Sequence, residues 1–158
     1  MDISVPIGDA GRFNYRIAVV IVHNGRVLLH KPVDDSYWAL PGGRAQLMEH
    51  SGDVAVREVW EELQVDIQVE RLLWITENFF TYAQEAFHEL GLYYKAALSD
   101  TSQISLHDGV FYGKEGERDL LYQWIPIEKL SDMTIKPPFL QKGLQQLPES
   151  IQHITIDD

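Results

Sequence analysis

The stretch GRAQLMEHSGDVAVREVWEELQV, residues 43–65, decides the fold of this chain. Its carboxylates Glu58, Glu61 and Glu62 are spaced i, i+3 and i+4, so on a helix they share one face within one turn. Apolar residues with the same helical period are predicted to form the opposite side, which packs on a core. This apolar set is Val56, Val59, Trp60 and Leu63.

The acidic face of this helix has two interpretations. Each like-charge i,i+4 pair destabilises a helix by about 0.2–0.5 kcal/mol, and Arg57 offsets part of this because it lies four residues before Glu61. Most acidic clusters are simply solvated surface. The alternative is a site for a hard divalent cation, which prefers carboxylate oxygens as ligands.

The residues before the helix favour the cation site. The sequence LPGG at residues 40–43 is a turn that cannot continue a helix or a strand. From Gly43 the chain follows the spacing G-x5-E-x7-R-E-U-x-E-E-x-G-U, where U is a bulky aliphatic residue. This spacing resembles the signature of the Nudix hydrolases. The matching positions are Gly43, Glu49, Arg57, Glu58, Val59, Glu61, Glu62 and Val65.

One position departs from that signature: Gln64 stands where the pattern has its second glycine. Glycine tolerates the left-handed conformation that ends many helices, and glutamine is expected to pay about 1 kcal/mol for it. No carboxylate is affected. We therefore expect a modest stability cost or a slightly different helix end, and not the loss of the site.

The resemblance implies an α/β (α+β) fold, a Nudix-type α/β/α sandwich with a mixed β-sheet between helices, as a single domain over residues 1–158. The order of expected elements agrees with this. Strands are expected at residues 16–23, 26–31, 37–40, 66–82, 87–98 and 120–125, and helices at residues 52–63, with Ser51 as N-cap, and 139–147. Residues 1–14 are expected to be irregular, residues 99–119 a loop or partial hairpin, and residues 148–158 a frayed end or a strand.

The implied activity is Mg²⁺-dependent hydrolysis of the pyrophosphate linkage in nucleoside diphosphate–X compounds by metal-assisted attack of water. Mn²⁺ is expected to substitute for Mg²⁺. By the same resemblance the metal ligands are Glu58, Glu61 and Glu62, with the Gly43 backbone as an additional oxygen ligand. Arg57 would orient a glutamate, and Glu49 would be an accessory carboxylate near the metals.

The general base and the substrate contacts stay open. Base candidates are Glu89, Glu115, Glu117 and Asp119, although a single surface acid is more often only solvated. Substrate-binding candidates are Trp38, Phe80 and Tyr82, whose rings could stack on a base, and also His88, Glu89 and Glu117. Strand alternation places Phe80 and Tyr82 on one face.

Composition limits the partners. The net charge of −11 argues against binding of a nucleic-acid backbone, which needs clustered Lys and Arg, but not against a small phosphorylated, nucleotide-like substrate. The absence of cysteine excludes disulfides and thiolate metal sites. No apolar run is long enough to span a membrane, and no signal peptide is visible, so the cytoplasm is the expected compartment. Monomer and homodimer are both open.

Two other functions share the expected fold. A catalytically silent nucleotide-binding or sensing module has no need to keep Arg57 together with the full carboxylate set. A prenyl diphosphate isomerase in its best-known form uses a cysteine, which this chain lacks. Hydrolysis is therefore the favoured hypothesis.

Overall fold

A mixed nine-stranded sheet forms the centre of the computed structural model, which describes residues 1–100 and 109–157. The strands are β1 (Ser4–Ile7), β2 (Gly11–His23), β3 (Arg26–Pro32), β4 (Gly42–Arg44), β5 (Ile67–Tyr82), β6 (Glu85–Leu98), β7 (Phe111–Glu115), β8 (Arg118–Pro126) and β9 (Gln152–Asp157). Their order is β7-β8-β3-β2-β6-β5-β9, and β1 and β4 pair with β2. The β2–β6 and β5–β9 pairs are parallel, and the other pairs are antiparallel.

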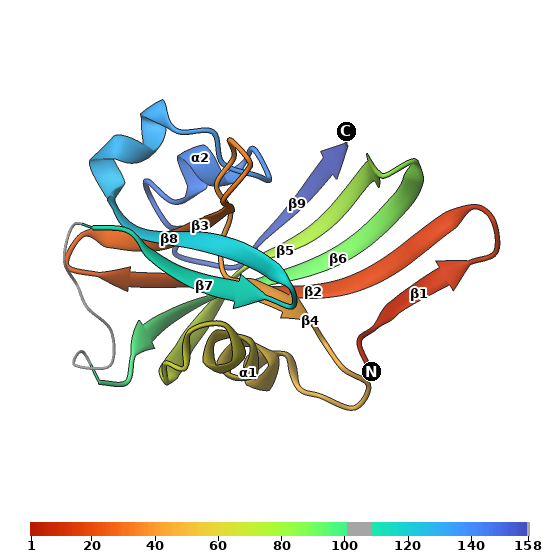
Figure 1. Ribbon diagram of the computed structural model, residues 1–158, viewed down its shortest axis with the longest axis horizontal. Coiled ribbons are helices and arrows are strands. Elements are labelled where there is room, and N and C mark those ends of the chain that lie inside the picture. The colour runs from red at the N-terminus through yellow and green to blue at the C-terminus, as the bar shows by residue number, and fades with distance from the viewer. Residues whose placement is uncertain (101–108, 158) are drawn as a thin grey trace.

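Helices cover both sides of this sheet (Figure 1). Helix α1 (Ser51–Leu63) lies on one side, and the 3₁₀ helix η1 (Ile127–Asp132) and the short helix α2 (Leu140–Gly143) lie on the other. The expected α+β sandwich with a mixed sheet is confirmed.

Strand β2 explains why the sheet is buried on both sides. Ile17, Val19 and Ile21 pack in the core cluster that contains the buried residues of α1. Ala18 and Val20 alternate with them and pack in the second cluster, with α2. Because side chains alternate along a strand, this unbroken apolar run supplies both cores.

The tight connection between β2 and β3 is an Asn-Gly hairpin turn, which joins the strands expected at residues 16–23 and 26–31. Asn24 has φ 49° and Gly25 has φ 72°, so both central residues adopt the positive φ that such two-residue turns require.

Both ends of the chain are more ordered than expected. The prediction that residues 1–14 are irregular is wrong, because β1 pairs with β2 from Ser4 to Asn14. The tail forms the strand alternative: β9 pairs with β5 and lies at the edge of the sheet. Strand pairing is a long-range contact, and the local sequence at neither end predicts its pairing partner.

Three other expected elements differ in extent. Residues 37–40 form only isolated bridges, at Trp38 and Ala39. The last helix is limited to Leu140–Gly143. Of the expected loop at residues 99–119, the part at 101–108 lies outside the described residues, and the rest includes β7, which pairs with β8. The pairing of β7 with β8 corresponds to the partial hairpin expected in this region.

Helix α1 has about the expected length, and two of its residues lie on other sides than predicted. Trp60 is 49% exposed, whereas Glu62 is only 8% exposed. The side toward the core is formed by Val54, Ala55 and Val59 together with Glu62. Val56 and Leu63 also pack against this core, so Trp60 is the one residue of the predicted apolar set that is misplaced, and Glu62 takes a place on the core side.

The predicted N-cap of α1 is also wrong. His50 occupies the N-cap position, and no side chain caps the helix there. The Ser51 hydroxyl instead shares a 2.6 Å hydrogen bond with the Tyr94 hydroxyl of β6. This bond joins the start of α1 to the sheet.

Gln64 ends α1 in the left-handed conformation, with φ 55°, and its N–H donates to Trp60 O. We expect Gln64→Gly to raise the free energy of unfolding by about 1 kcal/mol, because glycine adopts this conformation without the Cβ penalty. Urea denaturation measures the change. Gln68→Gly, at an exposed position of β5, is the control and should destabilise. An unchanged or lower stability of Gln64→Gly would contradict the strain that we assign to Gln64.

Candidate functional site

Arg57 gathers three of the motif carboxylates. Its Nε lies 2.7 Å from Glu49 Oε2, and its Nη1 lies 2.9 Å from Glu58 Oε1 and 3.2 Å from Glu61 Oε2. Its Nη2 also donates to the backbone oxygen of Arg44 at 3.1 Å, which ties α1 to β4. The hydrogen bond to Glu49 is the main cause that raises the pKa of Arg57, and the same bond lowers the pKa of Glu49. The arginine stays charged and holds Glu49 ionised.

Glu58 lies directly against the glycine turn. A Cβ added at Gly43 would collide with the Glu58 carboxylate, so only glycine leaves this space. The Glu58 side chain is 12% exposed, and burial raises its pKa although Arg57 acts in the opposite direction. The turn at the start of the motif therefore shapes the position of a carboxylate fifteen residues later (58 − 43).

Glu62 is the most deeply buried of the motif acids. Tyr122 of β8 donates a 2.9 Å hydrogen bond to its Oε2. Its Oε1 is buried and has no hydrogen-bond partner among the described residues. Burial, reinforced by the negative charge of Glu115, raises the pKa of Glu62 to about 8. The positive charge of Arg16 acts in the opposite direction but does not offset the burial of this carboxylate.

These acids fit a hard divalent cation by their chemistry. Glu58 and Glu62 are both buried enough to raise their pKa, and one Glu62 oxygen is unused. Within residues 1–100 and 109–157, no three acidic or histidine side chains stand close enough together to hold a metal as they are. A Mg²⁺ site takes one or two carboxylates and completes its shell with water and phosphate oxygens, which agrees with this sparse arrangement. Glu61 is 54% exposed and paired with Arg57, so it is the least enclosed of the three.

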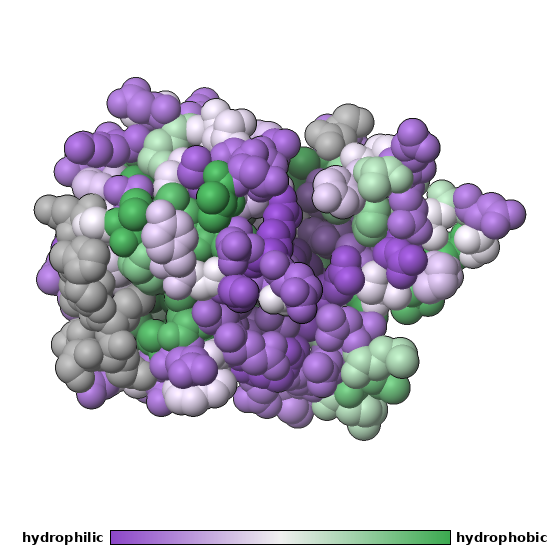
Figure 2. All heavy atoms as spheres, viewed as in Figure 1, coloured by the Kyte–Doolittle hydropathy of each residue, from purple (hydrophilic) through white to green (hydrophobic). Residues whose placement is uncertain are grey.

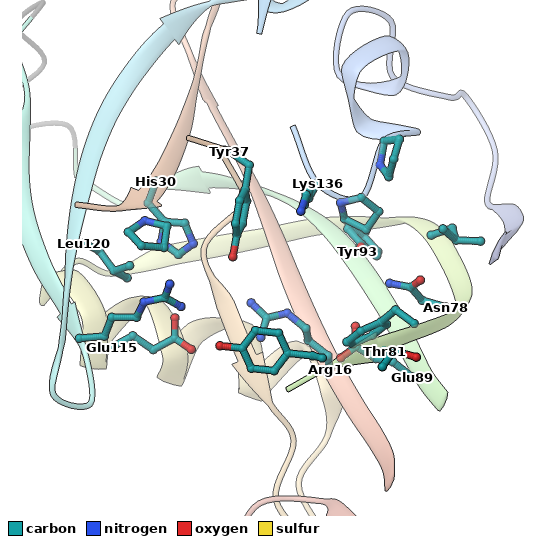
Figure 3. A pocket seen from close by; sticks show the side chains of 18 residues that line it. Arg16, His30, Tyr37, Asn78, Thr81, Glu89, Tyr93, Glu115, Leu120 and Lys136 are labelled. Carbon is teal, nitrogen blue, oxygen red and sulfur yellow. The ribbon is translucent and has the colours of Figure 1, made fainter. Parts of the chain in front are cut away.

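A cavity of about 410 Å³ is lined by Arg16, which pairs opposite Arg44 of β4, but by none of the motif carboxylates. Figure 2 shows a hollow with a hydrophilic rim on the viewed face. The residues that line the cavity are Arg16, His30, Pro32, Tyr37, Ala39, Asn78, Phe80, Thr81, Tyr82, Glu89, Tyr93, Glu115, Arg118, Leu120, Lys136, Pro137, Pro138 and Ile156. In Figure 3, His30, Leu120 and Glu115 lie at one end, Asn78, Thr81 and Glu89 at the other, and Arg16 and Tyr37 between them.

Arg16 connects the cavity to the motif acids. Burial acts to lower its pKa, but the negative charges of Glu89 and Glu115 outweigh burial and raise it. The charge of Arg16 in turn acts on both Glu58 and Glu62. The structure records no carboxylate within ion-pair distance of Arg16 among the described residues. Its guanidinium lines the cavity and carries a positive charge near the acidic helix.

His30 lies at the cavity end nearest Glu115 (Figure 3) and is only 4% exposed. Burial and the neighbouring positive charges of Arg16 and Arg118 lower its pKa to about 3. The imidazole is thus neutral at physiological pH. Its Nδ1 has no hydrogen-bond partner among the described residues.

The structure brings some predicted site residues into the cavity and leaves others out. Phe80, Tyr82, Glu89 and Glu115 line it. Trp38 lies outside the lining, with the Lys31 Nζ 5.7 Å from its ring centre. His88 packs between Phe13 and Phe79 and lines a separate surface pocket. Glu117 and Asp119 are exposed and do not line the cavity.

Sequence reasoning missed Arg16, His30 and Tyr122. One signal was available for the first two, because each is a polar residue inside a strand that is otherwise buried and apolar. Tyr122 gave no such signal, since tyrosine is common in strands. Only the pairing of β3 with β8 places Tyr122 beside His30.

Among the described residues, no helix is long and apolar enough to cross a membrane.

Comparisons with known proteins agree with this geometry. The family model of the NUDIX domain matches residues 13–147. A MutT-like protein of Streptomyces ambofaciens is 37% identical over 60 residues, which span 38% of this chain and only 39% of that protein. The solved structure of a mutator MutT protein from Bacillus halodurans is similar with a TM-score of 0.63 and 17% identity, covering 91% of this chain and 89% of that chain. An ADP-ribose pyrophosphatase from Streptococcus suis is similar with a TM-score of 0.58 and 15% identity, covering 90% and 98%. At these identities the two structures show a shared fold.

Proposed function

The chain belongs to the NUDIX family of hydrolases, and from this premise we propose that it cleaves the pyrophosphate linkage of a nucleoside diphosphate–X compound with Mg²⁺ and water. The observation that carries the proposal is the buried Oε1 of Glu62, which has no hydrogen-bond partner among the described residues, together with Arg16, which lines the cavity and whose charge acts on Glu62. The solved relatives include a protein described as an ADP-ribose pyrophosphatase and one described as a UDP-X diphosphatase. Both names describe substrates of the proposed class.

Each group of residues has a physical task in this proposal. Glu58 and Glu62 would supply carboxylate oxygens to the metal, with Glu61 as the more exposed third acid. Arg57 would hold Glu58 and Glu61 in place while it keeps Glu49 ionised. A bound Mg²⁺ would neutralise pyrophosphate charge and lower the pKa of a water molecule.

The cavity residues would bind the substrate. Arg16 faces the position where phosphate oxygens would approach the metal-binding acids, and a guanidinium binds phosphate through charge-assisted hydrogen bonds. Phe80 and Tyr82 offer ring faces to a nucleobase at the other side of the cavity. Of the candidate bases, Glu115 is the one whose negative charge raises the pKa of Glu62. It is the carboxylate that we assign to accept a proton from water.

A phosphate-release screen tests the proposed function. The substrates are nucleoside triphosphates, nucleotide sugars, ADP-ribose, dinucleoside polyphosphates and coenzyme A, each with Mg²⁺ and with EDTA. We expect hydrolysis of at least one class with Mg²⁺, supported also by Mn²⁺ and abolished by EDTA. Hydrolysis that is unchanged by EDTA, or no hydrolysis of any of these substrate classes, would contradict the proposal.

We expect Arg16→Gln to raise KM for the identified substrate by about tenfold or more, which corresponds to the loss of one charge-assisted hydrogen bond. Turnover at saturating substrate should change less, because Arg16 binds the substrate and does not replace a metal ligand. Steady-state kinetics separate the two parameters. Arg71→Gln is the matched control, since it also removes one arginine charge but lies outside the cavity lining. Equal KM values for Arg16→Gln and the unaltered protein would remove Arg16 from the substrate site.

A further inference from the structure

Tyr122 of β8 is the side chain that holds Glu62. Its ring is fully buried, and its hydroxyl donates the 2.9 Å hydrogen bond to Glu62 Oε2. Burial and the negative charge of Glu62 raise the pKa of Tyr122, so the phenol keeps its proton and stays a donor. The bond crosses from the sheet to α1, between residues sixty positions apart (122 − 62).

Neighbouring residues fix the ring of Tyr122 on several sides. Phe111 of β7 stacks on it with centroids 5.6 Å apart and planes at 15°. His30 of β3 meets it edge-on at 5.1 Å. A Cβ added at Gly113 would lie 2.8 Å from the ring, so a larger residue there would press on it. The hydroxyl therefore occupies one position, and rotamer freedom is already lost in the folded protein.

Tyr122 holds Glu62 through a hydrogen bond, as Arg57 holds the other motif acids through ion pairs. Arg57 contacts Glu49, Glu58 and Glu61, but the structure records no contact with Glu62. Among the described residues, the Tyr122 hydroxyl is the one recorded hydrogen-bond donor to the Glu62 carboxylate. With Oε2 engaged, Oε1 remains as the free oxygen.

We propose that Tyr122 is a positioning residue that binds one oxygen of Glu62 and thereby presents the other to the metal. This inference rests on the proposed function, because it requires Glu62 to be a metal ligand. Partners of this kind orient the ligating group, and their loss reduces metal affinity or activity by about 10–100-fold.

Tyr122→Phe tests the inference because it removes the hydroxyl and keeps the ring. Mn²⁺ is titrated calorimetrically into the full, metal-free chain. We expect the dissociation constant for Mn²⁺ to rise by about tenfold or more in Tyr122→Phe. Tyr94→Phe is the matched control, since it also deletes a phenol that bonds α1, at Ser51, and its Mn²⁺ affinity should match the unaltered chain. Thermal unfolding shows that both variants are folded.

A double-mutant cycle separates positioning from a general structural effect. In a Glu62→Gln background, Tyr122→Phe should cause no further loss of Mn²⁺ affinity. An equal loss in both backgrounds would mean that Tyr122 does not act through Glu62, and would overturn the inference. Phe111→Leu is the second variant, since it keeps the hydroxyl but loosens the ring, and it should weaken Mn²⁺ binding severalfold even if Tyr122→Phe does not fold.

The outcomes also separate the inference from the proposed function. If the unaltered chain binds neither Mn²⁺ nor Mg²⁺, both are wrong. If the unaltered chain binds Mn²⁺ and loses affinity on Glu62→Gln, but folded Tyr122→Phe or Phe111→Leu binds as tightly as the unaltered chain, only the role of Tyr122 is wrong.

Discussion

Glu62→Gln should lower turnover more than a hundredfold while the chain still folds. Glutamine has nearly the same shape but no negative charge, so it is a poor ligand for Mg²⁺. Loss of an outer-shell partner alone costs about 10–100-fold, and we expect loss of a ligand to exceed this. Steady-state kinetics with the substrate found in the screen measure the change. Near-normal turnover would contradict the role of Glu62 as a ligand.

Glu62→Gln should also change how the free energy of unfolding depends on pH. Burial raises the pKa of Glu62 in the folded chain to about 8 from 4.5. The contribution of this group to stability is therefore complete below pH about 4.5 and is lost as pH rises through 8. Without metal, Glu62→Gln should become increasingly more stable than the unaltered chain across this range. Urea denaturation at several pH values measures the difference, and a difference that does not change with pH would contradict the burial of the charge.

Asp53→Asn is the matched control for both measurements. It also removes one carboxylate from α1, but Asp53 lies in the first turn and is exposed. Turnover should be unchanged, and the stability should fall by only a few tenths of a kcal/mol because the helix dipole loses one favourable charge. A large loss of turnover in Asp53→Asn would indicate an effect of net charge and not of Glu62.

Gly43→Ala is expected to reduce turnover by about 10–100-fold without unfolding the chain. The φ angle of Gly43 is not among the positive values, so alanine is compatible with the backbone. The added Cβ would meet the Glu58 carboxylate, which is the end of a flexible side chain and can move aside. The fold therefore survives, but a proposed metal ligand leaves its position. Turnover should fall, and the Mg²⁺ concentration that gives half-maximal activity should rise.

Gly52→Ala is the control for this substitution. A Cβ added at Gly52 meets nothing within 4 Å, and alanine favours the helix by about 1 kcal/mol. Gly52→Ala should thus be more stable and equally active. If Gly43→Ala were also fully active, the contact between the glycine turn and Glu58 would have no part in the reaction.

Local spacing was sufficient to predict the helix that carries the motif. The residues that identify the motif lie within one turn of another or on the adjoining loop, so helical geometry alone brings Arg57 next to Glu58 and Glu61. The hairpin at Asn24 and Gly25 was equally predictable, because the turn type depends on those two residues. The burial of Glu62 and the exposure of Trp60 were not predictable, because they depend on which segments of the sheet pack against the helix.

The stretch at residues 43–65 by itself determined the family, the helix that carries the acids and the contact of Arg57 with its neighbours, because these are short-range relations along the chain. Tertiary structure alone decided that Glu62 points inward to Tyr122 and that Trp60 points outward. It also decided that Arg16 and His30 share a cavity with Phe80 and Glu115. These four residues belong to four different strands, and the pairing of strands distant in sequence, unlike the turn of a helix, has no local code.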